Sequence, residues 1–107
     1  MPRSVFLGEF EQLVLLSVMH LGDAAYVIDL RENLNAIAGR TVSRGSLYRT
    51  LDRLAEKGYV DWAVEEDVPG RSGHPRRNLR VTSRGREMLR LSRKTLLELW
   101  DGLEDSL

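Results

Sequence analysis

Three arginines, Arg44, Arg49 and Arg53, share one short segment with small hydroxyl residues and a glycine. Arginine carries a planar set of donors that pairs with guanine edges and phosphates, whereas hydroxyl groups and an exposed glycine backbone suit close phosphate contacts. Leucines recur in the same segment with helical spacing, so the arginines fall on the opposite side of one amphipathic helix. The pattern predicts a helix that binds nucleic acid, with candidate contacts at Ser43, Arg44, Gly45, Ser46, Tyr48, Arg49 and Arg53.

The ends of this helix are marked by the residues around it. Its apolar stripe is Leu47, Leu51 and Leu54, and Ser43 has the side chain of a typical N-cap. The dipeptide Lys57-Gly58 places a cation in the last turn and then a residue that tolerates the left-handed conformation. We therefore expect the helix to begin after Ser43 and to end at Gly58.

After the helix, the hydrophobic period changes from helical to alternating. Strands are predicted at Val60–Glu65 and Arg77–Val81, joined by a polar loop rich in glycine and proline. Long loops in small domains often carry function, and this one is basic. The predicted inward-facing residues are Val60, Trp62, Val64, Leu79 and Val81, and the candidate phosphate contacts of the hairpin are Arg71, His74, Arg76 and Arg77.

Two apolar segments precede this unit. Residues 8–21 are apolar almost all round, which predicts a helix buried on several sides. Gly22-Asp23 is expected to end that helix and start the next, which ends at Ala38-Gly39. A minor strand is expected at residues 40–42. The stripe of the second helix is Val27, Leu30, Leu34 and Ile37.

A last helix is predicted from a cap at Thr82 to the C-terminus. Its apolar residues follow nearly heptad spacing, which favours pairing with a second copy of the chain. A single subunit would leave an apolar patch larger than soluble monomers usually expose. Trp100 either lines a slot for a flat aromatic effector or only fills the dimer core. The predicted interface residues are Phe6, Phe10, Leu89, Leu96, Trp100, Leu103 and Leu107.

The charges are segregated along the chain although the formal net charge is zero. Residues 40–58 carry five bases and two acids, and residues 71–94 carry nine bases and one acid. Together these segments carry a net charge of +11. Because fields act within about one Debye length, ~10 Å, this local excess favours anion binding at the predicted helix and hairpin.

Several function classes are disfavoured by composition. The chain has no cysteine and only two histidines, His20 and His74, which are far apart, so no metal site and no cofactor are expected. No nucleophile motif or glycine-rich phosphate loop suggests an enzyme. No apolar run is long enough to span a membrane, and we expect a cytoplasmic protein.

The order of elements predicts a mainly α-helical fold with a small β-hairpin wing, that is, a winged helix-turn-helix over residues 1–81 followed by a dimerisation helix over residues 82–107, all within one compact domain. The chain resembles the PadR family of bacterial transcriptional regulators, in the short form with one C-terminal helix. The resemblance is carried by Leu7 to Glu11, by Gly45-Ser46-Leu47-Tyr48 with Leu51 and Arg53-Leu54, and by residues 73–82 leading into Gly85-Arg86.

The resemblance implies a homodimeric transcriptional repressor that binds double-stranded DNA at a palindromic or pseudo-palindromic operator. Release from the operator by a small effector, in some members an aromatic compound, is implied as well. It also implies that Tyr48 contacts a phosphate, although packing at the edge of the core is an equal alternative. Two positions depart from the family pattern. Tyr26-Val27 replaces an aromatic-glycine pair, and Asn78-Leu79 replaces paired tyrosines in the returning strand.

Two alternatives stay open at this point. A winged-helix module that binds protein would need an apolar or acidic third helix, whereas this one is basic. A MarR-like regulator would need flanking helices for which 107 residues leave no room.

Overall fold

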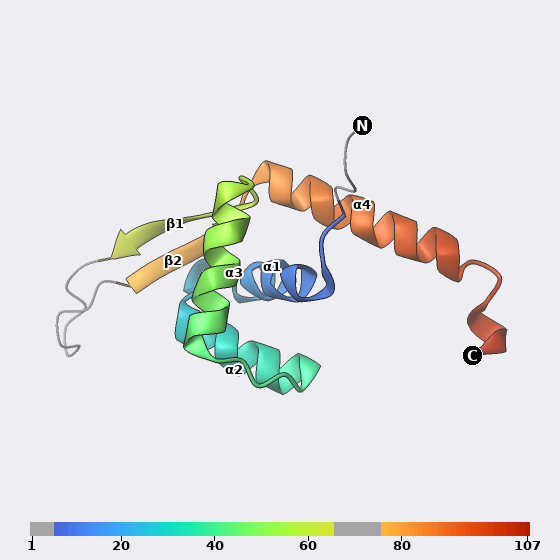
Figure 1. Ribbon diagram of the computed structural model, residues 1–107, viewed down its shortest axis with the longest axis horizontal. Coiled ribbons are helices and arrows are strands. Elements are labelled where there is room, and N and C mark those ends of the chain that lie inside the picture. The colour runs from blue at the N-terminus through green and yellow to red at the C-terminus, as the bar shows by residue number, and fades with distance from the viewer. Residues whose placement is uncertain (1–5, 66–75) are drawn as a thin grey trace.

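The computed structural model describes residues 6–65 and 76–107. Three helices pack together, a two-stranded hairpin projects from one side of them, and a long helix extends from the other side (Figure 1). The prediction of a mainly helical winged fold is thereby confirmed. In chain order the elements are α1 (Glu9–Leu21), the 3₁₀ turn η1 (Gly22–Ala24), α2 (Val27–Ala38), α3 (Arg44–Glu56), β1 (Val60–Glu65), β2 (Arg76–Val81), α4 (Ser83–Trp100) and the 3₁₀ turn η2 (Glu104–Ser106).

The apolar stripe of α3 lies at the centre of the core. Leu47, Leu51 and Leu54 are fully buried, as predicted. They pack in one cluster with residues from α1, α2 and both strands, among them Leu15 and Leu30. Burying a leucine side chain contributes about 1.5–3 kcal/mol. The orientation of α3 about its own axis is therefore set by its buried face.

The caps of α3 and α4 were predicted correctly. The Ser43 hydroxyl accepts a hydrogen bond from the backbone N–H of Ser46 at 3.1 Å, and Thr82 accepts one from Gly85 at 3.1 Å. Gly58 takes φ +81° after α3, which is the left-handed conformation that favours glycine. Gly85 has a further role, because a Cβ there would collide with the carbonyl oxygen of Tyr59. The absence of a side chain lets α4 start directly against the α3–β1 turn.

The strands form an antiparallel hairpin whose register pairs Val60 with Val81, Trp62 with Leu79, and Glu65 with Arg76. Leu79 and Val81 are buried, as predicted. The backbone N–H of Leu79 also donates to the carbonyl of Ala25 at 2.8 Å, which attaches β2 to the segment before α2.

Five details of the predicted elements were wrong. Val64 is 55% exposed because the hairpin has left the core by that point, and Ile37 is 67% exposed near the end of α2. Residues 40–42 form no strand, although Val42 is buried. The second helix begins only at Val27, because the chain first makes the η1 turn.

The fifth difference concerns the end of the chain. Helix α4 ends at Trp100, where Asp101 leaves the helical conformation and Gly102 takes φ +81°. Leu103 and Leu107 therefore do not extend the stripe of α4, as had been predicted. None of the helices in the described ranges is long and apolar enough to cross a membrane.

Electrostatic contacts tie α1 to the ends of α2 and α3. Lys57 Nζ lies 2.8 Å from Glu11, and Arg40 lies 2.9 Å from Glu9. Burial alone would raise the pKa of Glu11, but hydrogen bonds from Lys57 and from the backbone of Gly8 outweigh it and hold that pKa below its ordinary value. The carboxylate thus stays charged and holds the C-terminal end of α3.

Candidate nucleic-acid interface

The solvent-facing side of α3 is basic and open. Arg44, Arg49 and Arg53 are all exposed, opposite the buried leucines. Arg44 and Arg49 make no hydrogen bond or ion pair with any residue in the described part of the chain. Arg53 makes a long hydrogen bond to the Thr50 hydroxyl, at 3.5 Å, and its charge also acts on Glu11. At least two guanidinium groups are therefore available to an external anion.

The first turn of α3 has little that would keep a ligand away from its backbone. A Cβ built on Gly45 would meet no atom within 4 Å. Ser43 already satisfies the N–H of Ser46, which leaves the earlier N–H groups of the turn to solvent. Tyr48, on the flank of this surface, is half-buried and packs against the core. Both interpretations of Tyr48 are compatible with this half-buried position.

Arg77 lies between α3 and the hairpin. Its Nη1 is 3.3 Å from a carboxylate oxygen of Asp52 on α3. Its guanidinium lies 5.0 Å from the ring centroid of Tyr48 and 4.2 Å from that of Trp62 on β1. The side chain predicted as a phosphate contact is thus already engaged on three sides within the protein.

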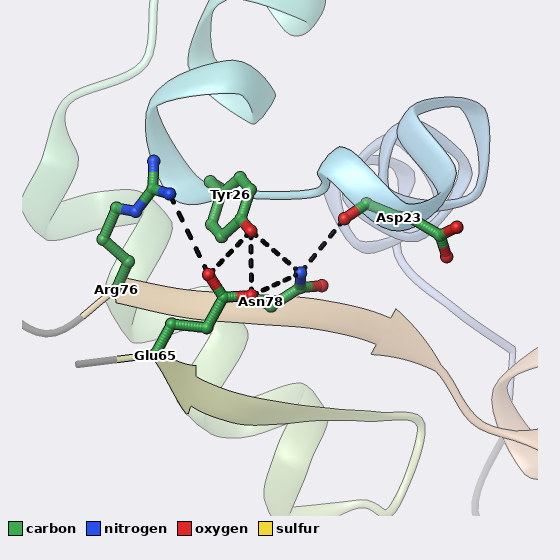
Figure 2. Close-up of polar contacts among 5 residues, drawn as sticks. All are labelled: Asp23, Tyr26, Glu65, Arg76 and Asn78. Carbon is green, nitrogen blue, oxygen red and sulfur yellow. Dashed lines mark hydrogen bonds and ion pairs between the residues drawn. The ribbon is translucent and has the colours of Figure 1, made fainter. Parts of the chain in front are cut away.

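Arg76 is engaged in a second polar cluster, which joins the hairpin to the start of α2 (Figure 2). The Tyr26 hydroxyl donates to the Glu65 carboxylate, 2.9 Å from each oxygen. The Asn78 amide donates to Glu65, to the Tyr26 oxygen and to the carbonyl of Asp23, at 3.0–3.1 Å. The Arg76 guanidinium stacks 4.1 Å from the Tyr26 ring centroid, with Nη2 3.9 Å from Glu65.

This cluster keeps its carboxylate charged. Hydrogen bonds from Tyr26 and then Asn78 lower the pKa of Glu65, with a smaller contribution from Arg76, and these effects exceed the opposing effect of desolvation. One of its members, Asn78, stands at a position that the resemblance marks as a departure, whereas Tyr26 keeps the expected aromatic residue. Asn78 thus supplies a polar partner to Glu65 at the outer end of the paired strands.

Sequence reasoning identified the basic face of α3 but missed the residues that hold the hairpin. Asp52, Trp62, Tyr26, Glu65 and Asn78 were not among the predicted site residues. The strand register was the available signal, since it pairs Glu65 with Arg76 across the hairpin. Of the hairpin candidates, Arg71 and His74 lie outside the described residues.

The predicted dimer residues lie on the other side of the molecule. A groove of about 530 Å³ runs between α1 and α4, lined on its apolar walls by Leu16, Met19, Leu89, Leu96, Leu97 and Trp100. Phe6 is half exposed, and Leu89 lies mainly within the subunit's own core. Phe10 is partly buried, with Arg40 5.1 Å from its ring centroid. Leu103 and Leu107 are exposed beyond the end of α4.

The described residues contain no group of three or more histidine or acidic side chains that could hold a metal ion. The arrangement is instead one of fixed positive charge at the surface of α3, beside a hairpin anchored to both α2 and α3. It suits recognition of a polyanion.

Comparisons with known proteins point the same way. Residues 15–91 match the model of the transcriptional regulator PadR-like family. A PadR family transcriptional regulator from Eggerthella lenta is 30% identical, with a TM-score of 0.64 over 91% of this chain and 84% of that one. A PadR-like transcription factor from Bacteroides fragilis is 23% identical, with a TM-score of 0.70 over 92% and 89% of the two chains. Among proteins with curated functions, none matches.

The Glu65 cluster generates a prediction about acid stability. Because the pKa of Glu65 is lowered in the folded state, its stabilising contribution is present above the ordinary value of 4.5 and is lost as pH falls through the folded-state pKa. We expect Glu65→Gln to unfold at lower urea concentration than wild type at neutral pH. The difference between the two proteins should shrink as the pH is lowered below 4.5.

The matched control is Glu87→Gln, at an exposed position of α4. The urea midpoint of Glu87→Gln should stay close to that of wild type at every pH. A gap between wild type and Glu65→Gln that stays constant through the acid range would contradict the stabilising role of the carboxylate.

Proposed function

The chain belongs to the PadR-like family of transcriptional regulators, and we propose that it regulates transcription by binding double-stranded DNA in a sequence-specific manner through α3 and the hairpin. The family is one of regulators and not of enzymes, in agreement with the sequence analysis. A regulator that binds the chromosome must be in the compartment that contains the chromosome, so a cytoplasmic location is part of the proposal.

The observation that carries this proposal is the free basic face of α3. Arg44 and Arg49 are exposed with no partner in the described residues, on a helix whose other face is buried. In the proposed complex α3 enters the major groove, where Arg49 pairs with a base edge and Ser43, Ser46 and the backbone at Gly45 contact phosphates. Tyr48 and Arg53 lie on the flanks of the same surface. The hairpin then follows the adjacent backbone.

The groove between α1 and α4 supports the proposal that the regulator is a homodimer. Leu96 is 49% exposed, Leu97 53% and Trp100 43%, all on one side of α4. A second copy would cover these side chains, with residues 1–81 serving DNA binding and residues 82–107 serving dimerisation. Two α3 helices related by a two-fold axis fit a palindromic or pseudo-palindromic operator with half-sites about 34 Å apart.

We further propose that DNA binding represses transcription and that a small aromatic effector releases the operator, as the family resemblance implies. The supporting feature is the indole of Trp100 in the wall of the apolar groove. A planar compound stacked there would quench Trp100 fluorescence. Trp62, which lies on β1, serves as the internal control. Quenching that survives in Trp100→Ala would place the compound elsewhere.

We predict that the protein binds duplex DNA with strong salt dependence. If a dimer neutralises about six to ten phosphates, affinity should fall by ~10³ to 10⁵ between ~50 and ~200 mM salt. Arg49→Ala should cost ~1–3 kcal/mol on the preferred sequence and relax the preference at one base pair. Fluorescence anisotropy with labelled duplexes measures both effects.

Gly45→Ala separates binding from folding. A methyl group there meets no atom within 4 Å and improves helix propensity, so thermal stability should be unchanged or raised by up to ~1 kcal/mol. The same methyl group should weaken DNA binding, because the backbone can no longer approach a phosphate closely. Failure of the wild type to bind any duplex at low salt would instead favour a protein-binding module.

A further prediction concerns the groove between α1 and α4. Leu97→Asp places a charge on the groove wall and should convert the dimer to a monomer in sedimentation equilibrium. Because two linked half-sites bind with an avidity gain of ~10² or more, operator affinity should fall by a similar factor. Leu91→Asp is the control, since Leu91 is 37% exposed on α4 but does not line the groove. A Leu97→Asp protein that still sediments as a dimer would contradict the proposed interface.

A further inference from the structure

Arg77 is held by contacts that join two separate parts of the proposed DNA-binding surface. Tyr48 and Asp52 lie one turn apart on α3, whereas Arg77 itself lies on β2 and Trp62 on β1. The carboxylate of Asp52 is 3.3 Å from Arg77 Nη1, and the two ring centroids are 4.2 and 5.0 Å from the guanidinium carbon. The Arg77 side chain is only 30% exposed.

The chemistry of this contact suits a positioning role. A planar guanidinium stacks flat on aromatic faces while its edge pairs with a carboxylate, whereas a lysine ammonium is a compact point charge with no flat face. The two aromatic rings and the Asp52 carboxylate each restrain the Arg77 guanidinium from a different side. Together they set the distance between α3 and the outer end of the paired strands.

We propose that Arg77 is a positioning residue that fixes the hairpin against α3, and that Asp52 is the acid that orients it. Arg77 then acts on DNA through the geometry of the wing and not through a phosphate contact of its own. This inference rests on the proposed function, because it explains how α3 and the hairpin present one rigid surface to a duplex. A looser hairpin would lower the fraction of molecules ready to bind, and the apparent affinity falls by that same fraction.

Removal of Asp52 distinguishes a positioning role from a purely electrostatic one, because the two roles predict opposite changes in DNA affinity. Asp52 is an exposed acid on the DNA-facing helix, so simple electrostatics predicts that its removal strengthens DNA binding. Removal would also free Arg77 for a phosphate. If Asp52 orients Arg77 as a positioning residue, its removal must weaken binding despite the gain in positive charge.

The hairpin provides a matched control pair. Arg80 and Asp61 face each other across the same two strands, with Arg80 Nε close to the Asp61 carboxylate at 2.6 Å. Both side chains are at least half exposed, and neither forms a hydrogen bond or ion pair with α3 in the described part of the chain. Asp61→Ala therefore removes an equal negative charge, and likewise leaves a hairpin arginine without its acid, but spares the contact between the hairpin and α3.

The test is the affinity of the full-length protein for one duplex selected by the wild type, measured by anisotropy at several salt concentrations. We expect Asp52→Ala to bind about three- to tenfold more weakly than wild type, because a less firmly held hairpin lowers the fraction of molecules ready to bind. Asp61→Ala should bind equally well or more tightly. An Asp52→Ala protein that binds more tightly, as Asp61→Ala does, would overturn the proposal.

Variants of Arg77 test the role of its planar group. Arg77→Lys keeps the charge, so it should bind well if Arg77 contacts a phosphate and as poorly as Arg77→Met if Arg77 is a positioning residue. Arg77→Met should lower affinity while the slope of log affinity against log salt stays unchanged. A slope reduced by ~0.9 per subunit would identify a direct phosphate contact and overturn the proposal.

Two measurements separate failure of the positioning role from misfolding of a variant and from failure of the proposed function. Thermal unfolding of each variant shows whether it is folded at the assay temperature, and Asp52→Asn replaces Asp52→Ala if the latter is not. Binding of wild type to no duplex at all would refute the proposed function itself. Normal wild-type binding with tighter Asp52→Ala binding would refute only the positioning role.

Discussion

Burial of the leucine stripe on α3 is the constraint on which the rest of the structure depends. Leu47, Leu51 and Leu54 have no exposed surface, so rotation of α3 about its axis would remove them from the core and expose them to water. That cost fixes the outward direction of Arg44 and Arg49. The basic face is thus set by hydrophobic packing on the opposite side of the helix, and the charges themselves contribute little to its placement.

The hairpin depends on the same core in a different way. Leu79 carries β2 into the core and also bonds to Ala25, but beyond this point the strands leave the body of the protein. Polar contacts take over there, with Arg77 bonded toward α3 and the Tyr26–Glu65–Asn78 cluster bonded toward α2. The wing is therefore held at two points by side chains whose partners are fixed by buried elements.

Sequence patterns predicted correctly those features that neighbouring residues along the chain determine, such as helix faces and helix caps. Helical spacing located the buried face of α3, and the hydroxyls of Ser43 and Thr82 marked two caps that the structure contains. Contacts between distant positions were not accessible in this way. Tyr26 and Glu65 are 39 residues apart, and only the strand register and the η1 turn bring them together. The end of α4 was missed because a heptad pattern continues past Gly102, whereas the backbone turns there.

The central claim is that α3 lies in the major groove of a duplex bound by two copies of the chain. Because the sequence contains no cysteine, a single thiol introduced by Ser46→Cys can carry an iron chelate that cleaves nearby DNA. We expect cleavage at two clusters about one helical turn apart on a selected duplex, with strand offsets typical of the major groove. The same chelate on Ser106→Cys, in η2, should cleave weakly or not at all. Stronger cleavage from position 106 than from position 46 would contradict the claim.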